Sequence, residues 1–267
     1  MLTIEQQGPV MRIRLARDIM GRVAYHTAAY WVDGLLIDSG CAYTSAALGA
    51  CLAALPVTLI VNTHSHEDHI GGNAEIQRAR RCTILAHRLA VGVLARPQLL
   101  ALQMYRRFFW GWPQPSIAQA IGTSVATERY SFRVVETPGH SADHICLYEP
   151  DQGWLFSGDA YIGGKDRAAR PDYDIPQMIE SLKLLAALNP ATMFPGSGTV
   201  RTNATMHLLQ KATYLDDLRD TARNLHQHGL DVAAIKIRLL GREPLLTALT
   251  LGHFSASNLI LACLRES

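Results

Sequence analysis

The most constraining feature of this chain is a run of metal-binding residue types directly after a short apolar segment. Residues 63–72 read THSHEDHIGG and follow residues 57–62, whose apolar character predicts a buried strand that ends in a loop. His64 and His66 are two positions apart, so on extended backbone both imidazoles point to the same side and can reach one ion. The segment therefore predicts a metal centre at the end of a strand.

The residues after this pair support the same interpretation. Asp68 and His69 lie where the chain turns past the ion, and the glycines at 71–72 allow a tight turn into a helix predicted from residue 73. A solvated polar loop without metal is the alternative. It has to account for three histidines and two acidic residues within six positions after an apolar strand, so we favour the metal centre.

Apolar periodicity along the chain predicts a mixed α/β fold. Strand-like runs occur at residues 10–16, 23–32, 35–38, 57–62, 83–86, 132–137, 145–149, 153–156 and 191–194. Helical spacing occurs at residues 45–55, 73–81, 87–102 and 176–188, and after Gly198 at 202–225, 231–239 and 255–264. We therefore expect a catalytic domain over residues 1–200 and a helical C-terminal region over residues 201–267.

Composition limits the classes of partner. Lys and Arg number 25 against 23 Asp and Glu, a formal net charge of +2, which does not indicate nucleic acid or an anionic membrane as a partner. The five cysteines are scattered and form no C-x-x-C pair, so neither a disulfide framework nor a thiolate zinc site is indicated. The start of the chain lacks a signal-type apolar run, and no stretch has the length of a membrane span. We expect a cytoplasmic protein that acts on a small-molecule substrate, without a nucleic-acid or membrane partner.

Three further motifs stand in order along the chain: IDSG at 37–40, TPGHS at 137–141 and FSGD at 156–159. Together with residues 63–72, they resemble the motifs of the metallo-β-lactamase superfamily. Its members include class B lactamases, glyoxalase II, lactonases, arylsulfatases, tRNA-processing nucleases and persulfide dioxygenases. The resemblance implies an α/β (α+β) fold, the four-layer αβ/βα metallo-β-lactamase sandwich, here with a C-terminal helical region.

The resemblance also implies the site. Its metal ligands would be His64, His66, Asp68, His69, His140 and Asp159. The first ion would use the histidines at 64, 66 and 140, the second would use Asp68 and His69, and Asp159 would bridge them. Asp68 is also the expected catalytic residue, because a carboxylate beside the nucleophile can orient it and accept its proton. Zn²⁺ is the expected cofactor, as one or two ions, with iron and manganese left open.

One motif departs from the family's pattern. Members usually have a further histidine in a Pro-Gly-His-Gly turn, where this chain has Ser197 within PGSG. A serine hydroxyl is a poor ligand beside imidazole, so the second site is expected to be weaker. His253, next to a glycine on a turn, is left open as a compensating ligand, with a packing role as the alternative.

The resemblance implies a metal-dependent hydrolase that attacks an ester-like carbonyl (a thioester, lactone or related acyl compound) with a metal-bound hydroxide. The helical C-terminal region favours a glyoxalase II-like enzyme. A mononuclear iron oxidoreductase similar to persulfide dioxygenases and a non-catalytic metal-binding protein of the same fold remain alternatives. The aromatic and basic segment 105–113 is interpreted as a lid or apolar wall over the substrate, or else as a core-docking or dimer-forming segment, so a homodimer stays open.

Overall fold

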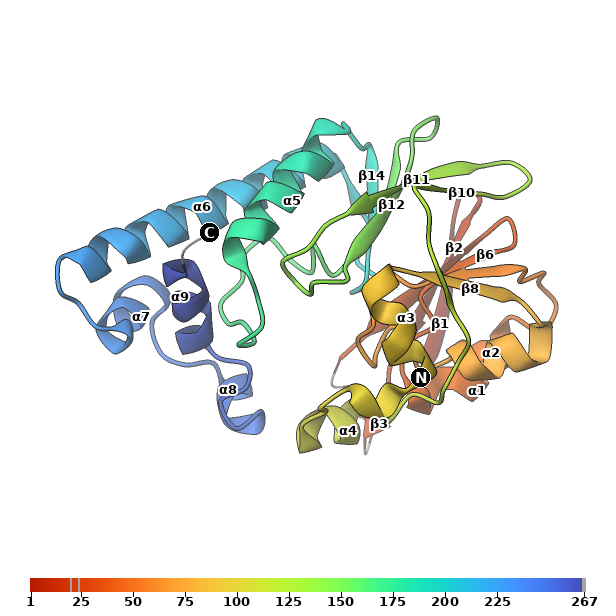
Figure 1. Ribbon diagram of the computed structural model, residues 1–267, viewed down its shortest axis with the longest axis horizontal. Coiled ribbons are helices and arrows are strands. Elements are labelled where there is room, and N and C mark those ends of the chain that lie inside the picture. Colours follow the sequence, from red (N-terminus) through yellow and green to blue (C-terminus); the bar gives the residue numbers. More distant parts are fainter. Residues whose placement is uncertain (20, 24, 266–267) are drawn as a thin grey trace.

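Two β-sheets face each other in a computed structural model that describes residues 1–19, 21–23 and 25–265 (Figure 1). The first sheet has seven strands in the order β1-β2-β5-β6-β7-β8-β9. Their bounds are β1 Leu2–Gln7, β2 Val10–Leu15, β5 Thr27–Val32, β6 Leu35–Ile37, β7 Leu59–Val61, β8 Thr83–Ala86 and β9 Gln119–Ala120. The strands from β6 to β9 pair in parallel, so β7 delivers its carboxyl end to the histidine-rich loop.

The second sheet has six strands in the order β10-β11-β12-β13-β14-β15. Their bounds are β10 Ser124–Ala126, β11 Ser131–Glu136, β12 Ile145–Glu149, β13 Trp154–Gly158, β14 Thr192–Pro195 and β15 Arg201–Thr202. Every residue of β12 and β13 is buried. These strands are covered on both faces, which explains why they appear in the sequence as continuous apolar runs without alternation.

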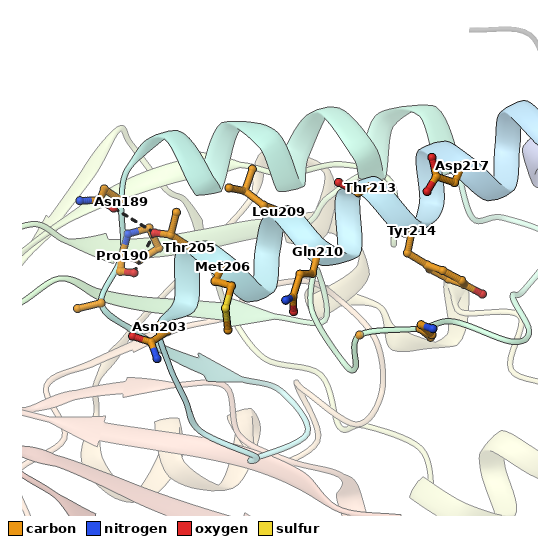
Figure 2. A pocket seen from close by; sticks show the side chains of 13 residues that line it. Asn189, Pro190, Asn203, Thr205, Met206, Leu209, Gln210, Thr213, Tyr214 and Asp217 are labelled. Atoms are coloured by element: carbon orange, nitrogen blue, oxygen red, sulfur yellow. Dashed lines mark hydrogen bonds between the residues drawn. The ribbon is translucent and has the colours of Figure 1, made fainter.

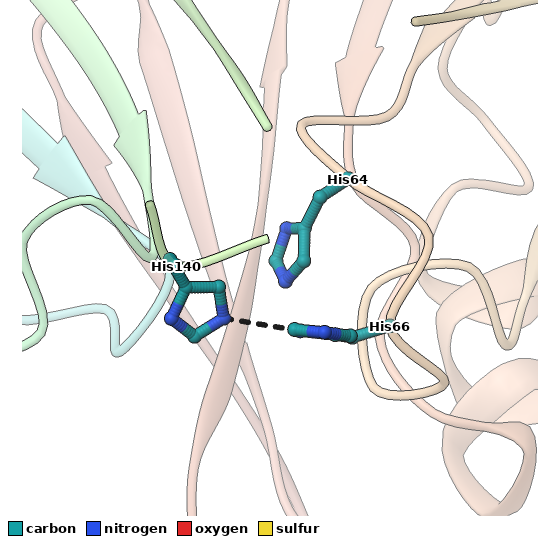
Figure 3. A group of neighbouring side chains, drawn as sticks. All are labelled: His64, His66 and His140. Atoms are coloured by element: carbon teal, nitrogen blue, oxygen red, sulfur yellow. Dashed lines mark hydrogen bonds between the residues drawn. The ribbon is translucent and has the colours of Figure 1, made fainter. Parts of the chain in front are cut away.

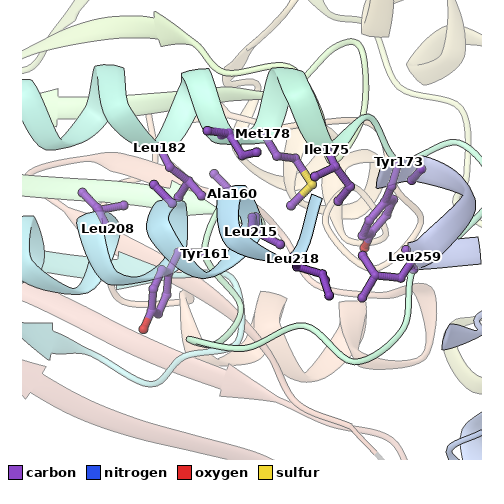
Figure 4. Close-up of a cluster of buried hydrophobic side chains, with 14 of the residues drawn as sticks. Ala160, Tyr161, Tyr173, Ile175, Met178, Leu182, Leu208, Leu215, Leu218 and Leu259 are labelled. Carbon is purple, nitrogen blue, oxygen red and sulfur yellow. The ribbon is translucent and has the colours of Figure 1, made fainter. Parts of the chain in front are cut away.

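Helices cover the outer face of each sheet. The helices are α1 Ser45–Cys51, α2 Asn73–Arg80, α3 Arg88–Ala95, α4 Met104–Trp110, α5 Ile175–Ala187, α6 Ala204–Gln227, α7 Val232–Leu240, α8 Leu245–Leu249 and α9 Ala256–Leu264. Leu48, Ile76 and Leu94, from the first three helices, share a core with the first sheet. Leu182, Leu215 and Leu259, from α5, α6 and α9, share another with the second sheet (Figure 4). The predicted four-layer αβ/βα sandwich is confirmed.

The middle of the sandwich is a third core, built by residues from both sheets. Tyr30 of the first sheet packs edge-on against Phe156 and Phe194 of the second, with ring centroids 5.6 and 5.5 Å away. The Tyr30 hydroxyl also donates to the carbonyl oxygen of Pro195 over 2.6 Å. These contacts join the two sheets just behind the turn that contains Ser197.

Some elements differ from the sequence prediction. The single strand expected over 23–32 is two strands in the structure. Strand β4 (Arg22–Val23) pairs with β3 (Asp18–Ile19) in a separate ribbon, and β5 begins at Thr27. Residue 24 lies outside the described residues. The helix expected through residue 102 is shorter: α3 ends at Ala95, and a 3-10 turn, Pro97–Leu99, follows. Strand β1 was not predicted, because it is an edge strand and four of its six residues are exposed. Its sequence therefore shows little apolar pattern.

Beyond Thr202, the described elements are all helices, although the predicted division at residue 200 stays a prediction. Within the described ranges, no helix combines the length and apolar character needed to cross a membrane. All five cysteines are free thiols, in agreement with the absence of a disulfide framework.

Candidate metal centre

The predicted ligands come from three separate segments. The loop between β7 and α2 contributes His64, His66, Asp68 and His69, the turn between β11 and β12 contributes His140, and Asp159 directly follows β13. Two groups of residues could each hold an ion, because within each group the ligand atoms all lie within 4.8 Å of one another. One group is His64 with His66 and His140 (Figure 3), and the other is His64 with His69 and Asp159. Asp68 is adjacent, with its Oδ2 3.9 Å from His69 Nε2. The structure thus brings all six residues together.

Asp38 fixes the orientation of two of these histidines. Its Oδ2 accepts a hydrogen bond from His69 Nδ1 over 2.8 Å and another from the Thr63 hydroxyl over 2.8 Å. Since that hydroxyl proton is used, Thr63 Oγ1 can only accept from His64 Nδ1, which lies 3.0 Å away. In the neutral form of either ring the proton is therefore on Nδ1, and Nε2 has a free lone pair. One carboxylate sets the tautomers of both histidines, as carboxylates often do for histidines that bind metals.

The other two histidines approach each other directly. His140 Nε2 lies 3.0 Å from His66 Nδ1 and 3.5 Å from Asp159 Oδ2. Two nitrogens bound to one tetrahedral zinc at 2.0–2.1 Å lie about 3.4 Å apart. The observed separation is close to this value, so the rings are placed as ligands of a shared ion would be.

The protonation behaviour of the cluster suits a cation. Burial lowers the pKa values of His64, His66 and His140 well below the usual range, so their rings are neutral. For His69, burial acts in the same direction, but the carboxylates of Asp159, Asp38 and Asp68 outweigh it and raise the pKa well above its usual value. Negative charge is therefore in excess around His69, and a divalent ion would balance it.

Buried ligand atoms that have no hydrogen-bond partner indicate whether these residues fit a metal. The Nε2 atoms of His64 and His69 and the Oδ1 of Asp159 are buried and have no hydrogen-bond partner among the described residues. Leaving such atoms unpaired is costly. An ion coordinated by them removes that cost, so the donor set fits a divalent metal.

His144 holds the backbone at Asp159, a role that sequence analysis did not identify. Burial lowers the pKa of His144 to about 4, so the ring is neutral. Its Nε2 accepts a hydrogen bond from the Asp159 amide over 3.0 Å, and Nδ1 therefore donates to Thr137 Oγ1, 2.8 Å away. The strand spacing from His140 to His144 gave no sign of this contact.

The turn that contains Ser197 packs tightly against the centre. A Cβ added to Gly196 would lie 2.3 Å from Asp159 Oδ1 and 2.8 Å from His69 Cε1, so only glycine fits. Ser197 Oγ is buried without a hydrogen-bond partner in the described part of the chain, and neither ligand group includes it. His253 is also outside both groups, and its Nδ1 lies 2.8 Å from the Tyr105 hydroxyl.

A pocket of about 320 Å³ opens onto the ligands. Its polar residues are Glu67, Asp68, Arg106, Asp159, Arg170 and the histidines at 66 and 140. Its walls are apolar and aromatic: Tyr25, Tyr105, Phe109, Trp110, Ile162, Tyr173, Leu246 and Phe254, with Thr250. Helix α4 supplies four of the pocket residues, so the segment 105–113 contributes a wall of this pocket.

Two polar contacts hold this wall in place. Arg106 donates through Nε and a terminal nitrogen to both carboxylate oxygens of Glu67, and both side chains are buried. At the preceding residue, Tyr105 bonds to His253, which connects α4 to the C-terminal helices. The wall is thus connected both to the histidine-rich loop and to the C-terminal helices.

A larger hollow lies elsewhere on the described part of the chain. A groove of about 1060 Å³ runs beside α6 and is lined by Asn203, Met206, Leu209 and Gln210 among others (Figure 2). It contains none of the clustered histidines and no metal-ligand group. The smaller pocket next to the ligands is therefore the candidate substrate site.

Comparison with known proteins identifies the family of this chain. The family model described as the metallo-beta-lactamase superfamily matches residues 24–197, and the chain belongs to that superfamily. It is 33% identical over 161 residues to a hydroxyacylglutathione hydrolase of Rhodospirillum rubrum, a match that covers 57% of this chain and 52% of the relative. It is 29% identical over 185 residues to an atrochrysone carboxyl ACP thioesterase of Aspergillus fumigatus, a match that covers 67% of this chain and 51% of the relative.

The fold is shared with solved structures as well. A metallo-beta-lactamase family protein of Thermus thermophilus superposes with a TM-score of 0.70 at 18% identity, over 96% of this chain and 91% of that one. At this identity the likeness shows the fold alone. The chain spans about half the length of the two curated relatives.

Proposed function

We propose that this protein is a metal-dependent thioester hydrolase. The observation that carries the proposal is the position of an apolar pocket of about 320 Å³ directly over the clustered metal ligands. Pockets with apolar walls and a few convergent polar groups are the usual form of small-molecule sites. A thioester has an apolar acyl part and a reactive carbonyl, which suit the walls and the polar base respectively.

The proposed ligands of the first ion are His64, His66 and His140. Asp68, His69 and Asp159 are the proposed ligands of a second ion, with Asp159 shared between the two. Zn²⁺ is the proposed metal, since neutral imidazole and carboxylate are among its usual ligands. The second ion is expected to bind less tightly, because Ser197 stands where a further imidazole would complete its ligands.

Different groups have different roles in the proposed reaction. A divalent ion, when bound, supplies a lowered pKa for a bound water and polarises a carbonyl oxygen. Asp68, which is buried and lines the pocket, would orient the attacking water and accept its proton. The aromatic side chains of α4 exclude bulk water from the reacting carbonyl.

Two similarities support thioesters over other carbonyl compounds. The relatives named above are a hydroxyacylglutathione hydrolase and an acyl carrier protein thioesterase, and both names describe cleavage of a thioester. The net charge of +2 gives no support to a nucleic-acid substrate.

Metal analysis combined with a substrate panel tests the proposal. The purified protein is expected to contain zinc, and to release free thiol from acyl thioesters faster than it opens lactones or cleaves phosphodiesters. Asp68→Asn should lower kcat by about 10²-fold or more. Asp151→Asn, which changes an exposed turn residue, serves as the matched control and should keep the parent rate.

Other results would overturn the proposal. One iron per chain, together with oxygen consumption on persulfides, would establish the dioxygenase alternative. Bound metal without turnover on any member of the panel would favour a non-catalytic metal-binding protein.

A further inference from the structure

Arg170 is a buried cation that faces the candidate metal centre. It lies in the loop between β13 and α5, is 7% exposed and lines the same pocket as His66 and His140. One terminal nitrogen is 2.7 Å from His66 Nε2 and 3.5 Å from the carbonyl oxygen of His140. Its guanidinium lies over the Tyr173 ring, 5.2 Å from the centroid.

The charge of Arg170 has no buried carboxylate partner among the described residues. The nearest acidic contact is Asp172, 3.4 Å from Nε, whose side chain is 60% exposed, and Nε itself has no hydrogen-bond partner. Arg106, in the same pocket, is instead paired through two nitrogens with Glu67. A buried guanidinium without such a partner is costly, so an acceptor from outside the chain is expected to complete its contacts.

The contact with His66 leads to the same expectation. The Nδ1 atom of His66 faces His140 within the ligand cluster, so with Nδ1 bound to the proposed first ion the neutral ring would carry its proton on Nε2. A guanidinium has no acceptor either. In that metal-bound form two donors would face each other over 2.7 Å, and an oxygen with free lone pairs would accept from both.

We propose that Arg170 and the Nε2–H of His66 form a carboxylate-binding subsite, so that the preferred substrate is an acyl thioester whose acyl chain bears a second, free carboxylate. A carboxylate matches the fork of a guanidinium and balances its single charge. The apolar walls of the pocket would contact the carbon chain between the carboxylate and the thioester. The assignment of the substrate class rests on the proposed function, whereas binding of the carboxylate does not.

Calorimetric binding of product-like acids to the metal-loaded protein tests the subsite without turnover. The probes are glutarate and adipate, each compared with the monoacid of equal length, pentanoate or hexanoate. At least one diacid is expected to bind about tenfold or more tightly than its monoacid, the scale of one charge-assisted hydrogen-bonded pair. Arg170→Gln should abolish this preference, and Arg170→Lys should retain part of it. The exposed Arg129→Gln should leave the preference unchanged.

The outcomes separate the subsite from the proposed function. Equal binding of diacids and monoacids by the parent protein would overturn the subsite, even if thioesters are hydrolysed. A diacid preference that depends on Arg170, in a protein that hydrolyses no thioester, would overturn the function and keep the subsite. A diacid preference that persists in both Arg170 variants would overturn the assignment to Arg170. A fall in kcat for all thioesters in Arg170→Gln, with the parent showing no diacid preference, would place Arg170 at the reacting carbonyl instead. Metal content is measured in each variant so that loss of the ion is not taken for loss of the subsite.

Discussion

Replacement of Arg106 is expected to destabilise the protein, because the buried Glu67 carboxylate then loses its partner. Arg106 and Glu67 form a two-nitrogen ion pair in which the exposed fractions of the side chains are 10% and 1%. Arg106→Met keeps the helix propensity of α4 and much of the side-chain volume, but it leaves the Glu67 carboxylate buried without its partner. Breaking a buried pair in this way costs about 3–5 kcal/mol.

The double variant distinguishes a coupled pair from two independent residues. In Glu67→Gln with Arg106→Met, neither charge remains, so the loss of unfolding free energy should be smaller than the sum of the two single losses by about 2 kcal/mol or more. Urea unfolding at a fixed excess of metal, followed by circular dichroism, measures all four proteins. Arg107→Met is the matched control on the same helix; it loses a contact with the Leu102 carbonyl and one with the Trp112 ring, and should cost about 1 kcal/mol at most. Additive losses, or a loss for Arg106→Met no larger than for Arg107→Met, would refute the coupling.

Three further predictions concern the centre and the C-terminal helices. Gly196→Ala places a methyl group 2.3 Å from Asp159 Oδ1, so metal titration should show binding that is weaker by about tenfold or more. Gly122→Ala is the control: no heavy atom lies within 4 Å of the added Cβ, so this variant should keep the parent affinity. Asp38→Asn should weaken metal binding by about 10–100-fold, because it removes an acceptor that orients two histidines; unchanged affinity would contradict that role. Although burial opposes it, hydrogen bonds from the start of α9 lower the pKa of Glu243 from 4.5 to about 2. Its stabilisation is therefore present above pH 4.5 and lost as pH falls towards 2. Glu243→Gln should lower the unfolding free energy by about 1 kcal/mol at pH 7, and this difference should shrink in acid; a difference that does not depend on pH would exclude the mechanism.

The clustering of candidate ligands in the loop after β7 was predictable because its information is local. His64, His66, Asp68 and His69 lie in one short segment after an apolar strand, and residue type with spacing is enough to indicate an ion. The remaining members, His140 and Asp159, were found through family motifs. The four-layer fold followed from the same motifs together with the alternation of strand and helix patterns.

The surroundings of the site were not predictable, because they depend on contacts between distant positions. Arg170 contacts His66 from 104 positions away, and Tyr105 contacts His253 from 148 positions away. Arg170 stands in no sequence pattern that singles it out, and the motif that contains Glu67 gives no sign of its pairing with Arg106. Only the paired sheets bring these side chains together, so the charge of the pocket and the attachment of its wall required the structure.

The separation of the ligands along the chain has a consequence for folding. His66 and His140 are 74 positions apart, so the first ligand group exists only once the two sheets face each other. His64, His66 and His69, however, lie on one short loop and remain close together in the unfolded chain. The unfolded chain therefore offers an ion a partial set of ligands, and any ion bound there reduces the stabilisation that the metal gives to the native state. The shift of the unfolding midpoint with metal concentration reports the difference between these two affinities, and the native affinity has to be measured separately.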